Sequence, residues 1–210
     1  MKLFLFLIQV FVVSLSGALQ PGPVTATAIS LGARNRWAGT LLAVGHGIVE
    51  FPLMVLIVLG LGEFFQKVAV KIVIGSAGGV VLLFMAYSMF KTAAHAVAAQ
   101  AGPAKAKPVL AGIVLTATNP YFLIWWTTVG LGFALTATNF GLHAFVLFVV
   151  VHWLVDFAWV TLLSFASFHG KTLLGPKPLE ITLKICAAAM LVFGLFFLQS
   201  SVTLLIKAIR

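Results

Sequence analysis

The chain has 210 residues, of which 62% are hydrophobic and 8% are charged, and its mean hydropathy is +1.17. Soluble domains average ~45–50% apolar and ~25% charged residues, so this composition excludes an ordinary soluble enzyme, a disordered chain and a coiled coil. The formal net charge of +9 comes from basic residues placed singly between uncharged runs, which indicates membrane topology and no nucleic-acid partner.

Apolar runs of membrane-spanning length, two of them with a single acid inside, recur along the whole chain. A hydrocarbon core ~30 Å thick needs about 20 apolar residues in a helix. The charges and turn residues leave six such runs, at 3–33, 37–61, 72–90, 108–138, 142–168 and 185–206. Lys2 and the small residues 14–18 also fit a secretory signal, but the first apolar run continues to Leu31. Because lipid tolerates no open sheet edge, we expect an all-α polytopic membrane protein of six helices.

The six predicted helices divide into two groups of three. The first group occupies residues 1–90, a polar linker covers 91–108, and the second group occupies 109–210, all within one membrane domain. The predicted loops on one side carry eight Lys and Arg residues, and those on the other side carry five. The positive-inside rule therefore predicts a plasma- or inner-membrane protein with both termini outside.

The second and fifth predicted spans share one polar pattern. His46 precedes Glu50 by four residues, and His152 precedes Asp156 by the same spacing, 106 residues later. Residues four apart lie on one face of a helix. Because each half holds an odd number of spans, the second half runs in the opposite sense. The sequence thus predicts an inverted-topology repeat, an architecture that many secondary transporters use.

Both acids of this pattern are predicted at the centre of the bilayer. Each lies about 12–14 residues from either end of its predicted span. An acidic side chain at that depth costs on the order of 2.5–3.5 kcal/mol or more. A histidine one turn away reduces this cost by sharing a proton or a hydrogen bond, so each pair is a candidate site for proton or ion exchange. The competing interpretation is that the pairs only hold helices together.

The first and fourth predicted spans contain helix breakers. Gln20-Pro21-Gly22-Pro23 interrupts the first span, and Thr118-Asn119-Pro120 interrupts the fourth, so both helices are expected to kink or unwind. A helix that restarts inside the membrane points its positive end at that depth and suits an anionic group. Paired breaks in two halves indicate a transport site, although the offset from Gly22 to Pro120 is 98 residues and differs from the 106 of the acid pairs. The alternative is that the kinks only shape packing.

These features together resemble the LysE/RhtB family of amino-acid exporters. The resemblance is carried by Pro21-Gly22-Pro23 late in the first span, the acid in the second, the polar linker, Asn119-Pro120 in the fourth, and Asp156 with Trp159 in the fifth. It implies an inner- or plasma-membrane exporter driven by proton or other ion exchange, with no cofactor. Glu50 stands where family members usually have Asp, and the two histidines are not general family features.

The leading hypothesis is a secondary transporter that exports a small solute, first of all an amino acid, by proton or other ion exchange. The alternative is a divalent metal exporter that uses the His/carboxylate pairs as ligands for its cargo. We expect no enzyme, because the sequence has no His-Glu-x-x-His motif, and its single cysteine excludes a redox carrier.

A water channel with twin Asn-Pro-Ala motifs is also excluded, while a structural or assembly role would not need two central acids. The expected partners are the solute, a coupling ion and the lipid bilayer, with a homo-oligomer left open; no resident metal is expected. The candidate substrate- and ion-binding residues are Gln20, Pro21, Gly22, Pro23, His46, Glu50, Asn119, Pro120, His152 and Asp156.

Overall fold

The computed structural model describes residues 2–98, 107–174 and 176–209, and within these ranges it contains helices and no strand. Five helices are long and apolar enough to cross a membrane, and the bent pair at the start makes a sixth span. The elements are α1 (Lys2–Ala18), α2 (Pro23–Gly32), α3 (Ala38–Leu56), η1 (Ile57–Leu61), α4 (Gly62–Gln66), α5 (Val68–Ala98), α6 (Pro108–Ala117), α7 (Pro120–Trp125), η3 (Trp126–Gly130), α8 (Leu131–Asn139), α9 (Leu142–Leu174) and α10 (Pro176–Ile209). The predicted all-α, polytopic class is confirmed.

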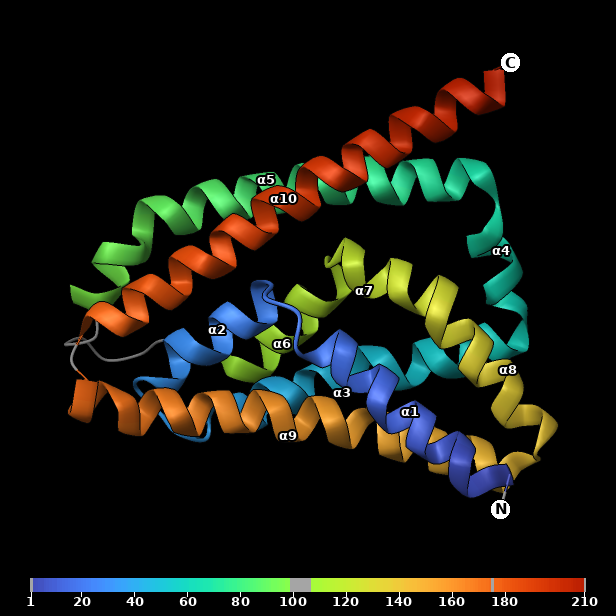
Figure 1. The fold of residues 1–210 in the computed structure, drawn as a ribbon, viewed down its shortest axis with the longest axis horizontal. Coiled ribbons are helices and arrows are strands. Elements are labelled where there is room, and N and C mark those ends of the chain that lie inside the picture. Colours follow the sequence, from blue (N-terminus) through green and yellow to red (C-terminus); the bar gives the residue numbers. More distant parts are fainter. Residues whose placement is uncertain (1, 99–106, 175, 210) are drawn as a thin grey trace.

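Corresponding spans of the two halves pack against each other. Helix α5 lies along α10 on one side of the bundle, and α3 lies against α9 on the other (Figure 1). The broken spans α1–α2 and α6–α8 lie between these pairs, and both ends of the chain are at the same end of the bundle. This pairing of third with sixth and second with fifth span supports the inverted repeat, which stays a prediction.

The first span is broken where the prolines and glycine predict it. Helices α1 and α2 meet at 74°. The carbonyl of Gln20 in the break accepts a hydrogen bond from the hydroxyl of Thr25 at 2.9 Å. Gly22 precedes α2 in an extended conformation, and no side chain caps this helix start. The break therefore leaves backbone N–H groups of the α2 start without a capping side chain inside the bundle.

The fourth span is broken at Asn119. Helix α6 ends at Ala117 and α7 begins at Pro120, so the chain restarts directly after the asparagine. The Asn119 Oδ1 atom accepts the backbone N–H of Tyr121 at 3.1 Å, which is the expected N-cap. The span then continues through a π-helical turn, η3, to the end of α8.

The two breaks lie at one level of the bundle. Helix α1 has 17 residues before its break, counted from the end that carries the chain termini. The fourth span runs the other way and has 20 residues, 120–139, between its break and that same end. Both breaks are therefore a similar distance from the terminal end. In an inverted repeat, breaks at equivalent positions of the two halves would lie at mirrored depths in the bundle. An offset of 98 residues between the breaks, in place of the 106 between the acid pairs, instead brings both breaks to a similar depth.

Three local features differ from the sequence expectation. The second span turns sharply at Gly60, whose φ of 113° suits glycine, before α4 leads into the third span. Glu63 and Glu180 lie outside the predicted spans, yet they are on helices α4 and α10, and Glu180 pairs with Lys184 at 2.7 Å. The polar linker 91–108 starts on the end of α5, and its residues 99–106 lie outside the described residues.

Small residues allow α3 and α6 to approach closely. A Cβ added at Gly112 of α6 would collide with the carbonyl oxygen of Leu42 and lie 3.0 Å from the backbone nitrogen of His46. Because backbone atoms cannot move aside cheaply, no larger residue fits. This contact holds the fourth span against the helix that carries His46 and Glu50.

We predict that Gly112→Ala destabilises the protein by roughly 1–3 kcal/mol, because it overpacks this contact. Gly132→Ala is the matched control, since a Cβ there meets nothing within 4 Å. Thermal unfolding in detergent compares the two. Equal melting temperatures would show that the α3–α6 approach is not tight.

Candidate functional site

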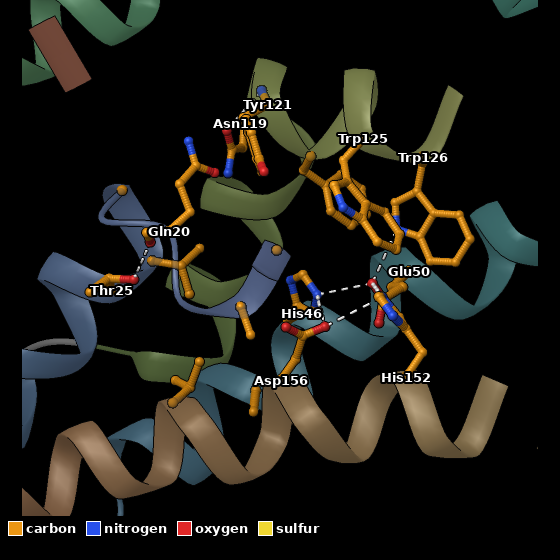
Figure 2. A pocket seen from close by; sticks show the side chains of 17 residues that line it. Gln20, Thr25, His46, Glu50, Asn119, Tyr121, Trp125, Trp126, His152 and Asp156 are labelled. Carbon is orange, nitrogen blue, oxygen red and sulfur yellow. Dashed lines mark hydrogen bonds and ion pairs between the residues drawn. The ribbon is translucent and has the colours of Figure 1, made fainter. Parts of the chain in front are cut away.

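Four ionisable side chains from α3 and α9 form one cluster, which we call the tetrad. It consists of His46, Glu50, His152 and Asp156. The Nε2 atoms of His46 and His152 each lie 3.2 Å from Glu50 Oε1. The same two atoms lie 3.8 and 3.5 Å from Asp156 Oδ2. Each imidazole therefore faces both carboxylates, and the two predicted pairs merge into one group (Figure 2).

Glu50 lies at the most buried corner of the tetrad. Its side chain is 1% exposed, and its Oε1 accepts a third hydrogen bond from Trp126 Nε1 at 3.2 Å. Among the described residues, its Oε2 atom is buried and has no hydrogen-bond partner. The Trp126 N–H can only donate, and each Nε2 that carries a hydrogen adds a further donor to the same oxygen. Glu50 is thus the acceptor that joins α3, α9 and η3.

Asp156 occupies the accessible corner. Its side chain is 16% exposed, against 1% for Glu50. The two Nε2 atoms are farther from its oxygen than from that of Glu50. A proton or a ligand ammonium group in the cavity therefore reaches Asp156 more readily than Glu50.

The imidazole of His152 is enclosed by aromatic rings. It stacks on Trp125 with ring centroids 4.9 Å apart and meets Trp126 edge-on at 5.0 Å. Aromatic faces attract cations. These rings therefore suit an imidazole that carries a positive charge.

Each histidine also has a hydroxyl partner on a broken span. Ser14 Oγ of α1 lies 2.7 Å from His152 Nδ1, and Thr116 Oγ1 of α6 lies 2.8 Å from His46 Nδ1. Both hydroxyl residues are buried. All of the ring nitrogens in the tetrad are therefore engaged.

The tetrad forms one wall of a cavity of about 80 Å³ at the level of the two breaks. A water molecule takes up about 30 Å³ in the liquid, so the cavity holds only a few waters or a small solute. It is lined by Gly17, Ala18, Gln20, Gly22, Val24, Thr25, Ala43, His46, Glu50, Asn119, Tyr121, Phe122, Trp125, Trp126, His152, Asp156 and Val160.

Most of the candidate residues meet at this cavity. Gln20 and Gly22 of the first break and Asn119 of the second line it together with the tetrad (Figure 2). Pro21, Pro23 and Pro120 are not among its lining residues. Pro120 instead packs against α5, where a Cβ added at Gly78 would collide with its ring. The prolines therefore shape the breaks, while their neighbours present polar groups.

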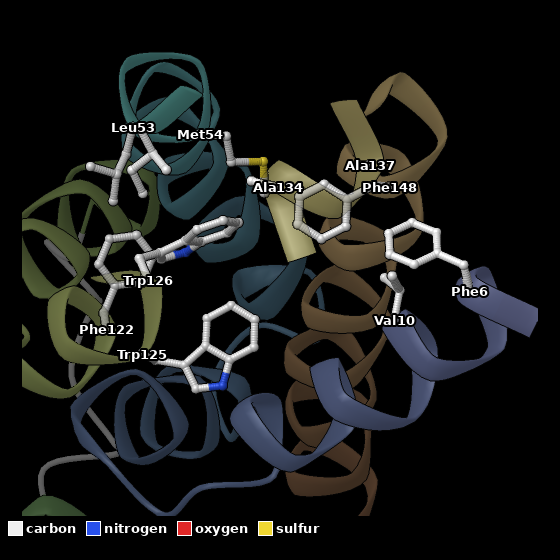
Figure 3. Packing of buried hydrophobic residues seen from close by; sticks show 11 residues of the cluster. Phe6, Val10, Leu53, Met54, Phe122, Trp125, Trp126, Ala134, Ala137 and Phe148 are labelled. Carbon is white, nitrogen blue, oxygen red and sulfur yellow. The ribbon is translucent and has the colours of Figure 1, made fainter. Parts of the chain in front are cut away.

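An apolar cluster closes the bundle on the terminal side of the tetrad. Phe6 and Val10 precede Ser14 on α1, Met54 and Ile57 follow Glu50, and Phe148 precedes His152, so each lies nearer the terminal end (Figure 3). The ring of Phe6 lies 6.5 Å from that of Phe148 and 5.9 Å from that of Phe133. We call the residues Phe6, Val10, Met54, Ile57 and Phe148 the aromatic plug. They belong to one buried core with Leu53, Phe122, Trp125, Trp126, Ala134 and Ala137, of which Phe122, Trp125 and Trp126 also line the cavity.

The tetrad has the ligand types of a cation site. One ligand atom from each of His46, Glu50 and Asp156 lies within 4.8 Å of the others. His152 Nε2 lies within 3.5 Å of both carboxylates. Two imidazoles with two carboxylates suit a first-row transition metal better than Mg²⁺ or Ca²⁺, which prefer oxygen ligands alone.

Sequence reasoning missed Ser14, Thr116 and the contact of Trp126 with Glu50. Buried serine and threonine are common in membrane helices, so their types carry no signal by themselves. Their positions did offer one, because each precedes a predicted break by a few residues.

A family model described as LysE type translocator matches residues 15–201 of the chain. This range includes both breaks and all four residues of the tetrad. Neither a curated protein nor a solved structure matches the chain.

We predict that Glu50→Gln destabilises the protein more than Asp156→Asn. Breaking a buried ion pair from one side costs about 3–5 kcal/mol, and the amide in place of Glu50 would leave two imidazole donors and the Trp126 N–H around a neutral group. Asp156 is partly exposed and makes longer contacts, so its loss costs less. Thermal unfolding at neutral pH measures both, and a greater loss in Asp156→Asn would contradict the assigned roles.

Proposed function

Because the chain belongs to the LysE type translocator family, we propose that it exports a small amino-acid-like solute in exchange for protons held by the tetrad. As a family member it is a multi-pass membrane translocator. The observation that carries the finer proposal is that the tetrad and both helix breaks line one small cavity. Solute and coupling ion would therefore share one space and influence each other directly.

A zwitterionic solute matches the charges on opposite walls of this cavity. Asp156 offers a partly exposed carboxylate to an ammonium group, and the remaining carboxylate is enclosed by its donors. Across the cavity, α2 begins at the first break with no capping side chain, so its N–H groups are available to a carboxylate. The side chains of Gln20 and Asn119 add polar groups on that wall.

The size and lining of the cavity favour a small solute. The cavity of about 80 Å³ suits the polar head of a small solute, whose amino and carboxylate groups would lie between the tetrad and the first break. The aromatic residues Phe122 and Trp125 form an apolar surface beside the tetrad. The two imidazoles of the tetrad face its two carboxylates, and only the Asp156 carboxylate is accessible to an ammonium group of the solute. A single accessible carboxylate favours a solute with a neutral side chain over one with a cationic side chain.

The aromatic plug supports the direction of transport. It closes the path from the tetrad toward the terminal end, and the cavity extends toward the other end. That other end carries the larger number of basic residues and is predicted to face the cytoplasm. An exporter must load from the cytoplasm, so this arrangement fits its loading state.

Protonation of the tetrad would couple export of the solute to entry of protons. An ammonium group that pairs with Asp156 competes with a proton for the same carboxylate. A coupling ion shifts a conformational equilibrium only through different affinities for the two states. A tetrad that gains protons after the plug opens would therefore release the solute outside and carry protons inward.

Proteoliposomes with an imposed pH gradient test this function. A screen of L-amino acids identifies the solute, and we expect Asp156→Asn to lower its gradient-driven flux by roughly 10–100-fold. Losing a charge-assisted hydrogen bond of about 1.5–3 kcal/mol accounts for that range. Glu180→Gln is the matched control, because this acid pairs with Lys184 away from the cavity. Unchanged flux in Asp156→Asn would overturn the proton role.

The alternative function, export of a divalent metal, is favoured by one observation. The four nitrogen-to-oxygen distances around the tetrad are 3.2, 3.2, 3.5 and 3.8 Å. Ligands at Zn²⁺ bond lengths of ~2.0–2.2 Å in a tetrahedron lie roughly 3.3–3.6 Å apart. Ligand atoms of three tetrad residues, His46, Glu50 and Asp156, all lie within 4.8 Å of one another, so these three would approach such a cargo ion together.

Zn²⁺ added to the purified protein distinguishes the two functions. Metal export predicts a rise in melting temperature with Zn²⁺, none with Mg²⁺, and loss of the rise in His46→Gln. It also predicts Zn²⁺ flux in proteoliposomes. No thermal shift and no flux would dismiss this alternative and leave the amino-acid proposal untouched.

A further inference from the structure

The hydroxyls of Ser14 and Thr116 are not directed at their own helices, unlike those of several threonines in the chain. Thr118, Thr136 and Thr203 each donate to the carbonyl four residues earlier in their own helix, at 2.7, 2.8 and 2.9 Å. Such back-bonding is the usual local choice of a helical threonine. Ser14 and Thr116 instead contact an imidazole nitrogen on another helix.

The contacts favour one nitrogen of each imidazole as the carrier of the proton. The Nε2 atoms of His46 and His152 face carboxylate oxygens, and an ionised carboxylate only accepts hydrogen bonds. Facing an ionised carboxylate favours the neutral imidazole that carries its hydrogen on Nε2, although these contacts alone leave room for the other tautomer. In a neutral imidazole Nδ1 is then an acceptor, and the hydroxyl of Thr116 or Ser14 donates to it. In an imidazolium Nδ1–H donates, and the same hydroxyl oxygen accepts.

We propose that Ser14 and Thr116 are positioning residues that hold His152 and His46 in the Nε2–H tautomer, so that the broken spans are connected to the tetrad. A hydroxyl suits this role because it both donates and accepts, and so it keeps its contact in either protonation state of the imidazole. Valine or alanine can do neither. The effect on transport, unlike the effect on the tautomer, rests on the proposed function.

Each of the two contacts joins one half of the chain to the other. Ser14 in the first span contacts a histidine of the fifth, and Thr116 in the fourth span contacts the histidine of the second. Ser14 lies six residues before Gln20, and Thr116 lies three before Asn119, so each hydroxyl is on the helix that ends at a break. A solute that moves either break also moves the hydroxyl partner of one histidine.

Few other groups can influence these imidazoles. The titratable groups that line the cavity around them are Glu50 from α3, Asp156 from α9 and Tyr121 from α7. Helices α2 and α6 contain no Asp, Glu, Lys, Arg, Tyr or Cys. A change in histidine behaviour after substitution of a hydroxyl is therefore attributable to the lost contact.

Nitrogen NMR of the purified protein with ¹⁵N-labelled histidine tests the tautomers without any transport assay. Loss of signals in His46→Gln and His152→Gln assigns the two imidazoles. At a pH where they are neutral, we expect a single Nε2–H tautomer for both in the natural protein. Thr116→Val should replace this by a mixture for His46 alone, Ser14→Ala should do so for His152 alone, and Thr116→Ser should restore the natural pattern.

The control is Thr40→Val, which removes a hydroxyl that pairs with Thr161 at 3.2 Å away from the tetrad. It should leave both tautomers unchanged whatever it does to stability. An Nε2–H tautomer that persists for His46 in Thr116→Val and for His152 in Ser14→Ala would overturn the proposal. A different tautomer in the natural protein would do the same.

A transport assay then distinguishes a positioning role of Thr116 from a role in packing alone. We expect Thr116→Val to shift the pH of half-maximal flux by about 0.5–1 unit, because a hydrogen bond to a charged imidazole is stronger than one to a neutral imidazole and the lost contact therefore affects the two protonation states unequally. Thr116→Ser should restore the natural profile. If the variants change the tautomers as expected but the natural protein shows no proton-driven flux, this inference stands and the proposed function is refuted.

Discussion

The structure depends on two carboxylates inside a membrane bundle, one buried and one partly exposed, that share two imidazoles. Neither Glu50 nor Asp156 could remain ionised there alone, because an uncompensated charge is expensive in a low-dielectric interior. Each Nε2 atom faces both acids, so four groups on two helices reduce one another's cost. This requirement places α3 and α9 side by side and in register, and the other helices pack around that pair.

The broken spans bring the polar backbone to the same level. Both breaks lie a similar distance from the terminal end although the two spans run in opposite directions. The helix ends at the two breaks therefore line one cavity. The tetrad forms one wall of this cavity, and the start of α2, which no side chain caps, forms another. A membrane tolerates such irregular backbone only where it lines a cavity or is covered by protein. The same geometry that satisfies this constraint creates a space for a polar solute.

Much of this architecture was predictable from the sequence, because membrane helices must be long, apolar and uncharged. Charges delimited the spans, prolines located the breaks, and the repeated His-x₃-acid spacing identified the tetrad residues. What the sequence could not give was which faces meet. That His46 contacts Asp156, that Trp126 donates to Glu50, and that Ser14 holds His152 are all consequences of helix packing between distant segments.

Two other features of the fold were not predicted from the sequence, each for a local reason. The bend at Gly60 needs a positive φ that a glycine permits but does not require, so a lone glycine in an apolar run gave no signal. The charged residues Glu63 and Glu180 suggested loops, yet helices extend beyond the hydrocarbon and present such residues outside it. Charge marked the limit of the apolar span and not the end of the helix.

Proton release on solute binding measures the central claim most directly, because it asks whether the solute and the protons compete for the tetrad. L-amino acids are titrated one at a time into the purified protein in weakly buffered detergent solution, with a pH indicator dye present. The account predicts that a bound amino acid displaces protons from the natural protein and that Glu50→Gln with Asp156→Asn abolishes the release. Binding without any proton release across pH 5–8 would contradict it.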